Sequence, residues 1–198
     1  MHSMNEVQTI QKYASLCQIK DFYNAKKKPL KSRKNLAKKG KKKIMLKVLF
    51  ICHGNICRST MAQSVMTYLI KQHHLEHLLH IASAATSREE IGNPPHYGTV
   101  NKLRQVGIPV IPHRAVQMTK ADYAEYDYLI GMDSANIRNM TRIAEGDPQG
   151  KIYKLLTFAG SDRDVADPWY TGDFDATYRD VLSGCEGLLN YLQEQGQC

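Results

Sequence analysis

The chain has 198 residues, of which 42% are hydrophobic and 23% charged, and its formal net charge at pH 7 is +8. These values are ordinary for a soluble globular protein and fit one domain with an appendage. No apolar run approaches the roughly 18 residues that a membrane-spanning helix needs, and the N-terminal residues lack a secretory signal pattern, so we expect neither a membrane span nor export. The five cysteines form neither a paired framework nor a metal-ligand cluster, which favours the reducing cytoplasm and predicts no metal and no cofactor.

The positive charge is concentrated at the N-terminus. Residues 1–44 carry 13 Lys or Arg and two Asp or Glu, whereas residues 45–198 carry 14 and 17. We expect residues 1–44 to be a basic, disordered extension and residues 45–198 to be the folded domain, because clustered like charges repel one another and offer little to bury. Three interpretations of the extension stay open: a non-specific contact with polyanions, a solvated segment without a partner, and a natural start of the protein at Met45.

From Leu46 onward, strand-like and helix-like segments alternate. In chain order they are a strand at 46–51, a helix over 61–70, a strand at 80–84, a helix over 100–106 that Gly107 stops, a short helix capped by Thr119, a strand at 127–132, a helix capped by Asp133, a strand at 151–156 and a long helix over 174–192. This alternation predicts a parallel sheet with helices on both faces. Ligands of such sheets bind at the carboxyl ends of the strands, so we expect the functional site in the turns that follow the strands.

The first strand-to-helix turn reads Cys52-His53-Gly54-Asn55-Ile56-Cys57-Arg58-Ser59, and we call residues 52–59 the phosphate loop. Backbone N–H groups of a tight loop, together with the N-terminal dipole of the next helix, attract an anion. Gly54 and Asn55 tolerate the unusual backbone angles that such a loop needs, and Arg58 can grip two phosphate oxygens. We therefore predict that Cys52, where these dipoles converge, is a thiolate nucleophile stabilised by Ser59, rather than a small buried hydrophobe.

A second candidate segment, Asp167-Pro168-Trp169-Tyr170, follows the fourth predicted strand. Its loop lies at the same end of a parallel sheet as Cys52. A phosphate ester expels a poor anion unless an acid protonates the leaving oxygen. We predict that Asp167 supplies this proton beside apolar walls formed by Trp169 and Tyr170; the simpler alternative is a structural Asp-Pro turn.

Taken together and in order, the segments VLFICHGNICRSTMAQ, ASAATS, GIPVIPHRAVQ, YLIGMDSANIR and DPWY resemble the low-molecular-weight protein tyrosine phosphatases. The resemblance covers about residues 46–195. It implies a four-stranded parallel sheet of flavodoxin-like order and hydrolysis of phosphotyrosine through a phosphocysteine intermediate. By position it makes Cys52 the nucleophile, Arg58 the phosphate clamp, and Asp167 first the general acid and then the general base.

The same resemblance assigns supporting roles. It implies that Asn55, Ser59, Ser83 and His113 hold the loop by hydrogen bonds, and that Tyr170 and Trp169 flank the phosphoaryl ring. The sequence departs from the family pattern at four positions, where His53 replaces an aliphatic residue, Thr60 a Pro, Gln63 a Glu and Trp169 a Tyr. His53 and Trp169 leave substrate preference open.

Other functions can be weighed on the same residues. In the related arginine phosphatases a Thr typically occupies the position of Ile56, and an aliphatic side chain there favours an aryl ring over a charged guanidinium. Thioredoxin-coupled arsenate reductases need a further cysteine pair, but no cysteine lies between Cys57 and Cys185. A binding module that works through residues 1–44 would not explain Cys52 and its partners, so it can only be an added role.

We expect phosphotyrosine-containing proteins as partners, no specific nucleic acid, and a monomer or weak dimer. Cys57 lies five residues after Cys52. A sulfenic acid at Cys52 could condense with Cys57 and escape further oxidation, which predicts redox sensitivity. The alternative is that Cys57 only packs beneath the loop.

Overall fold

The computed structural model describes residues 45–198; the predictions made for residues 1–44 lie outside the described residues. Four parallel strands form one sheet in the order β2-β1-β3-β4, which confirms the predicted topology. The strands are β1 (Leu46–Cys52), β2 (Leu79–Ala85), β3 (Tyr128–Gly131) and β4 (Ile152–Lys154). β1 is central and pairs with β2 from Leu46↔Leu79 to Cys52↔Ala85 and with β3 on its other side. The strand order therefore reverses at β1, the kind of point where parallel sheets bind ligands.

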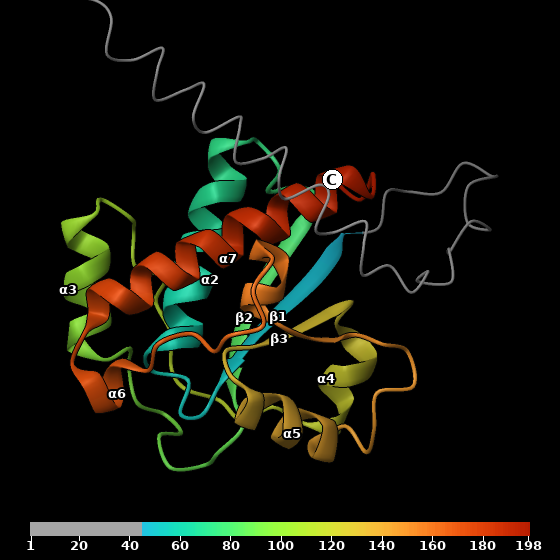
Figure 1. The fold of residues 1–198 in the computed structure, drawn as a ribbon, viewed down its shortest axis with the longest axis horizontal. Coiled ribbons are helices and arrows are strands. Elements are labelled where there is room, and N and C mark those ends of the chain that lie inside the picture. The colour runs from blue at the N-terminus through green and yellow to red at the C-terminus, as the bar shows by residue number, and fades with distance from the viewer. Residues whose placement is uncertain (1–44) are drawn as a thin grey trace, which may run out of the picture. The chain divides into compact units, whose positions relative to one another are not determined.

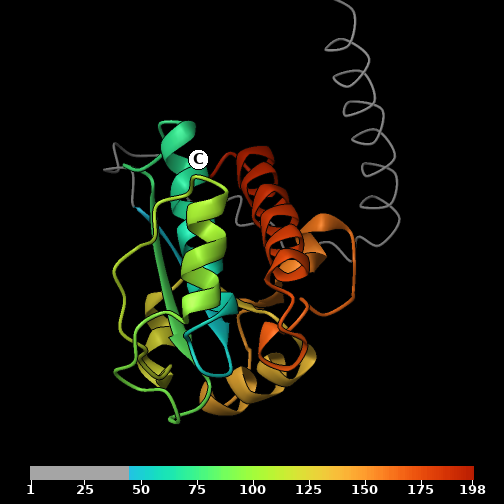
Figure 2. The ribbon, with the colours of Figure 1, turned by 90° about the vertical axis from the view of Figure 1, so that its left-hand side faces the viewer.

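Helices cover both faces of the sheet (Figures 1 and 2). They are α2 (Arg58–Gln72), α3 (Tyr97–Gln105), α4 (Lys120–Glu125), α5 (Ser134–Ile143), α6 (Pro168–Thr171) and α7 (Phe174–Glu194). Successive side chains of a strand point to opposite faces. Val48 and Phe50 of β1 accordingly pack in the core with α2, α3 and α7, whereas Leu49 and Ile51 pack with α4 and α5.

The predicted helix boundaries have identifiable causes. Gly107 has a φ of +74°, which suits the turn that follows α3. Thr119 begins α4 in a capping box with Asp122. Asp133 begins α5 by accepting a hydrogen bond from the backbone N–H of Asn136 at 2.6 Å. Within the described residues, no helix combines the length and the apolar character needed to cross a bilayer.

The fourth strand is shorter than the prediction of 151–156. β4 ends at Lys154, and Leu155–Ala159 form a 3-10 helix, η1. Neighbouring strand residues would point to opposite faces, yet Leu155 and Leu156 both pack in the core beneath α7. α7 comes so close here that a Cβ at Gly184 would lie 2.4 Å from the Leu155 side chain. Burial of both leucines under this helix therefore ends the strand.

Candidate active site

The phosphate loop is built around the side chain of Asn55, a buried residue with a φ of +59°. Its Nδ2 donates to Ser59 Oγ and to Ser83 Oγ, both at 2.9 Å. Its Oδ1 accepts the backbone N–H of Val116 at 3.1 Å and lies 2.6 Å from His113 Nε2. These contacts use both donors and both lone pairs of the amide. Hydrogen bonds of the Asn55 amide thus tie the loop to β2 and to the segment after residue 112.

His113 contributes as a neutral ring. Because Asn55 Oδ1 has no proton to give, His113 Nε2 must donate in this contact. Burial lowers the pKa of His113, which favours the uncharged form. His113 therefore supports the loop without adding charge to it.

Cys52 ends β1 and is buried beneath the loop. Its Sγ lies 3.1 Å from Ser59 Oγ and accepts the backbone N–H of Asn55 at 3.3 Å. Since Ser59 Oγ already accepts from Asn55 Nδ2, its own proton is available to the sulfur. The first turn of α2, which starts at Arg58, adds the positive end of a helix dipole. The sulfur thus faces a hydroxyl, a backbone N–H and the start of a helix.

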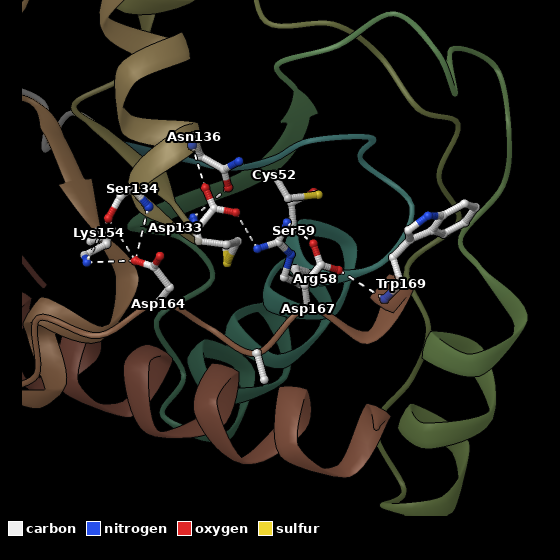
Figure 3. A network of polar contacts seen from close by, with 12 residues as sticks. Cys52, Arg58, Ser59, Asp133, Ser134, Asn136, Lys154, Asp164, Asp167 and Trp169 are labelled. Carbon is white, nitrogen blue, oxygen red and sulfur yellow. Dashed lines mark hydrogen bonds and ion pairs between the residues drawn. The ribbon is translucent and has the colours of Figure 1, made fainter. Parts of the chain in front are cut away.

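Arg58 is buried and lies between two carboxylates, as Figure 3 shows. Nη1 contacts Asp133 Oδ2 and Nη2 contacts Asp167 Oδ2, each at 2.6 Å. Burial alone would lower the pKa of Arg58, but the charges of Cys52, Asp167 and Asp133 outweigh it and raise that pKa. The guanidinium is thus permanently charged and held in one orientation beside Cys52.

Asp133 was predicted only as a helix cap, and the structure gives it a second contact. Oδ1 accepts the N–H of Asn136 while Oδ2 holds Arg58. A signal was present in the sequence, because Asp133 follows the strand that neighbours β1 and so lies at the same sheet edge as Cys52.

Asp167 is the last residue of a segment, residues 163–167, that is fixed from two sides. On one side the Asp164 carboxylate accepts Ser134 N and Oγ, both at 3.1 Å, and Lys154 Nζ at 2.8 Å (Figure 3). The hydrogen bond from Lys154 chiefly lowers the pKa of Asp164, although partial burial opposes it. The backbone N–H of Val165 donates to Met132 O at 2.9 Å.

On the other side, α7 holds the residue that precedes the acid. Asp180 accepts the N–H of Ala166 at 3.0 Å, and Thr177 Oγ1 donates to the Ala166 carbonyl at 2.8 Å. Asp180 also accepts both Nη atoms of Arg163, at 2.7 and 2.5 Å. Both peptide groups that flank Ala166 are therefore fixed, which limits where the Asp167 side chain can reach.

Comparison with known proteins agrees with this geometry. Residues 47–198 match the family profile described as low molecular weight phosphotyrosine protein phosphatase. The chain is 39% identical over 155 residues to the low molecular weight protein-tyrosine-phosphatase YfkJ of Bacillus subtilis, an alignment that covers 77% of this chain and 99% of that protein. It is 36% identical over 149 residues to PtpA of Staphylococcus aureus, covering 75% and 94%. The chain belongs to the low molecular weight protein-tyrosine-phosphatase family. It is a protein-tyrosine phosphatase.

Solved structures support the same assignment for this phosphatase. The crystal structure of YfkJ superposes with a TM-score of 0.74 over 77% of this chain and 97% of that one. A Drosophila arginine phosphatase, DARP, is 28% identical and superposes with a TM-score of 0.69 over 75% and 98%. The fold is thus shared by proteins named for two different phosphoryl substrates.

The remaining loop residues of this phosphatase have mainly packing roles. Asn55 alone in the loop adopts a positive φ, so the prediction that Gly54 needs an unusual angle is wrong. A side chain at Gly54 would instead crowd Glu90, because a Cβ there would lie 3.0 Å from Glu90 Cγ. Ile56 and Cys57 are buried beside Ala115. Burial, followed by the charges of Cys52 and Asp167, raises the pKa of Cys57 to about 12.

The rim of the site is exposed. Trp169 is 61% and Tyr170 85% solvent-accessible, so the two predicted ring walls are open to solvent. The Asp167 carboxylate beside them contacts Arg58. His53, another exposed residue of the loop, has its Nε2 2.9 Å from Glu89 Oε2. Glu89 was not predicted as a site residue, because nothing in the local sequence links it to His53.

Two departures from the family pattern are accommodated locally. Thr60 Oγ1 donates to the Cys57 carbonyl at 2.9 Å inside the first turn of α2. Gln63 Oε1 accepts the Ser83 hydroxyl at 2.7 Å and so extends the hydrogen-bond chain that begins at Asn55. The hydrogen-bond partners of Cys52 Sγ are instead Ser59 Oγ and the backbone N–H of Asn55.

Proposed function

We propose that this phosphatase hydrolyses phosphotyrosine in proteins through a phosphocysteine intermediate, with Cys52 as nucleophile, Arg58 as phosphate clamp and Asp167 as general acid and base. The observation that carries the proposal is the set of contacts made by Arg58. Its two guanidinium nitrogens are held by Asp133 and Asp167, beside a thiol that accepts a loop N–H. The nucleophile, the cation that binds the phosphoryl group and the acid thus lie close together.

In the first step, the Cys52 thiolate attacks phosphorus as the bond from phosphorus to the tyrosine oxygen breaks. Asp167, in its protonated form, gives its proton to that oxygen, so tyrosine leaves as a neutral phenol. The loop N–H groups and Arg58 hold the three non-reacting oxygens, where negative charge is concentrated.

Arg58 must change one partner when the phosphoryl group enters. The contact of Nη1 with Asp133 can stay, because it lies on the helix side of the site. Nη2 exchanges the Asp167 carboxylate for a phosphoryl oxygen, which frees Asp167 to turn to the leaving oxygen. Asp133 then fixes the orientation of the guanidinium throughout the cycle.

In the second step, Asp167 accepts a proton from water, and the water oxygen attacks phosphorus. The bond from sulfur to phosphorus breaks, and its electron pair returns to Cys52. Ser59, whose hydroxyl lies 3.1 Å from Sγ, stabilises the departing thiolate. Inorganic phosphate leaves and the starting state is restored.

Tyrosine is favoured over arginine as the substrate residue. The relatives of 36 and 39% identity are named as protein-tyrosine phosphatases, whereas DARP, the arginine phosphatase, is 28% identical. The buried aliphatic side chain of Ile56 in the loop also suits an aryl ring better than a guanidinium. We further propose that the enzyme works in the cytoplasm, where the free thiols of Cys52 and Cys57 stay reduced.

The deciding experiment compares wild type with Cys52→Ser. Matched peptides that carry phosphotyrosine, phosphoarginine or phosphoserine are assayed for phosphate release, and rapid acid quench traps any phosphoenzyme. We expect turnover mainly of phosphotyrosine, a phosphoenzyme in wild type, and neither in Cys52→Ser, which should still bind vanadate. Substantial turnover by Cys52→Ser, or preference for phosphoarginine, would overturn the proposal.

A further inference from the structure

A groove of about 610 Å³ adjoins the phosphate loop along one side of α3. Ile56 of the loop and Trp169 beside the acid line it near the reacting centre. The α3 side of the groove is lined by Tyr97, Val100, Asn101 and Arg104. Their spacing of three, four and seven residues places these side chains on one face of the helix. The groove therefore follows the helix for two turns.

The inner end of this groove is anchored by His96. Its backbone N–H donates to the Ile56 carbonyl at 2.8 Å, which fixes the start of α3 to the loop. Its ring stacks on Phe174, with centroids 5.4 Å apart and planes at 5°, and meets the Trp169 ring edge-on at 6.2 Å. A Cβ at Gly98 would lie 2.3 Å from the Phe174 ring, so α3 sits directly against that ring. The wall is formed before a ligand arrives, which reduces the entropy lost on binding.

The outer end of the groove carries a cation that the rest of the described chain does not neutralise. Arg104 is exposed and forms no ion pair with any residue in the range 45–198. Lys102, two residues earlier, differs because it pairs with Asp175 at 2.5 Å. At the inner end, Glu90 lies near Ile56 with its carboxylate held by Asn93 Nδ2 at 2.7 Å. The groove thus runs from an apolar and acidic end to a basic end.

We propose that this groove binds the segment of the substrate protein that flanks phosphotyrosine, and that Arg104 selects an acidic residue about three positions away. The seven residues from Tyr97 to Arg104 span about 10 Å of helix, which is about three residues of an extended peptide. The residues between would rest on Val100 and Trp169. This inference rests on the proposed function, because the flanking chain reaches the groove only if phosphotyrosine occupies the phosphate loop.

The test uses the full chain and two kinds of substrate. The first kind is a set of paired phosphotyrosine peptides that differ only in having Glu or Lys at one position, which is placed two, three or four residues before or after phosphotyrosine. The second is p-nitrophenyl phosphate, which is too small to enter the groove. Arg104→Glu is compared with Arg142→Glu, a matched charge reversal at an exposed residue of α5 outside the groove. Both sites are exposed, so both variants should fold.

In wild type we expect kcat/KM to favour the Glu peptide over the Lys peptide at one of these positions by about two- to five-fold, the range of one exposed ion pair. Arg104→Glu should reverse this preference, mainly through KM, and leave p-nitrophenyl phosphate turnover unchanged. Arg142→Glu should preserve the preference. Absence of any preference in wild type, or equal effects of the two variants, would overturn the proposed role of the groove in substrate binding. Failure of wild type to hydrolyse p-nitrophenyl phosphate would instead count against the proposed function.

Discussion

In the phosphate loop, Asn55 is fully buried, and every donor and acceptor of its side-chain amide has a hydrogen-bond partner. At the rim of the same site, Tyr170 is 85% exposed. The loop contacts β2 and the segment around His113 through side chains. The rim around α6 is held chiefly by hydrogen bonds of Asp180 and Thr177 to Ala166, the residue before Asp167. The two regions face the same reacting centre, but one is internal to the fold and the other is surface.

This difference separates two tasks. Donors that stabilise a transition state act best when they are fixed before the substrate arrives, and burial provides that. A protein substrate must reach the phosphate loop over exposed side chains, so the rim has to remain accessible. We therefore expect substitutions in the loop to damage chemistry and folding, and substitutions in the rim to change substrate preference.

The largest effect should come from Arg58→Ala. The change removes both nitrogens that face the phosphoryl oxygens and leaves Asp133 and Asp167 close together without the cation between them. Loss of one transition-state donor typically costs about 100- to 1,000-fold in kcat, and we expect at least this from steady-state assays with p-nitrophenyl phosphate. Arg58→Lys should recover little, since an ammonium cannot bridge two partners in a fork. A loss below tenfold would contradict the role of Arg58 as clamp.

Asp167→Asn should show an effect that depends on the leaving group. An amide cannot donate the proton that a basic phenolate needs, so kcat/KM for phenyl phosphate should fall by about 100-fold or more. Phosphates of very acidic phenols need little protonation and should lose less. The measurement is a plot of log kcat/KM against the pKa of the leaving phenol. An equal loss across the series would identify Asp167 as a structural turn residue.

Asp180→Asn should produce a weaker version of the same pattern. Asp180 fixes Ala166 and Arg163 but does not contact Arg58 or Cys52 among its described partners. A displaced acid should lower kcat/KM by about tenfold for basic leaving groups, less than the 100-fold that a 1 Å displacement can cost. In an Asp167→Asn background the second change should add nothing. Asp175→Asn, an exposed position on the same helix, is the matched control, and an additive loss in the double variant would argue for a general effect on folding.

Asn55→Ala and Tyr170→Ala compare the two regions by stability. The first leaves buried partners of the Asn55 amide unsatisfied and should lower the free energy of unfolding by about 1–3 kcal/mol. The second removes an exposed ring and should stay within about 0.5 kcal/mol. Urea unfolding followed by circular dichroism measures both. Similar losses would show that the rim is part of the folded framework.

The smallest effect concerns oxidation of the loop. Peroxide should inactivate the enzyme reversibly, and recovery with thiol reductant should be poorer in Cys57→Ser, because a Cys52 sulfenic acid and the Cys57 thiol can form a disulfide and water. With its pKa raised to about 12, Cys57 is almost entirely protonated at neutral pH. Its thiolate fraction grows as pH rises towards that value, so the fraction of recoverable enzyme should increase between pH 7 and 9. Equal recovery in both proteins would exclude the protective disulfide.

Local sequence was enough to predict β1 and the starts of α4, α5 and α7. In each, the deciding signals are neighbours in the chain, such as Asp133 three residues before Asn136. The end of β4 could not be predicted, since it depends on how closely α7 approaches at Gly184. The pairs Arg163–Asp180 and His53–Glu89 join residues far apart in the chain, and charged residues at the surface offer many equivalent pairings.

Asp133 divides one carboxylate between the start of a helix and the cation of the active site. A replacement at this position consequently affects the helix start and the active-site cation at once. A residue that begins α5 equally well, such as Ser, still leaves Arg58 without one of its two anchors. The start of α5 and the orientation of Arg58 are thus coupled through a single side chain, and a substitution that preserves the helix can still disturb the active site.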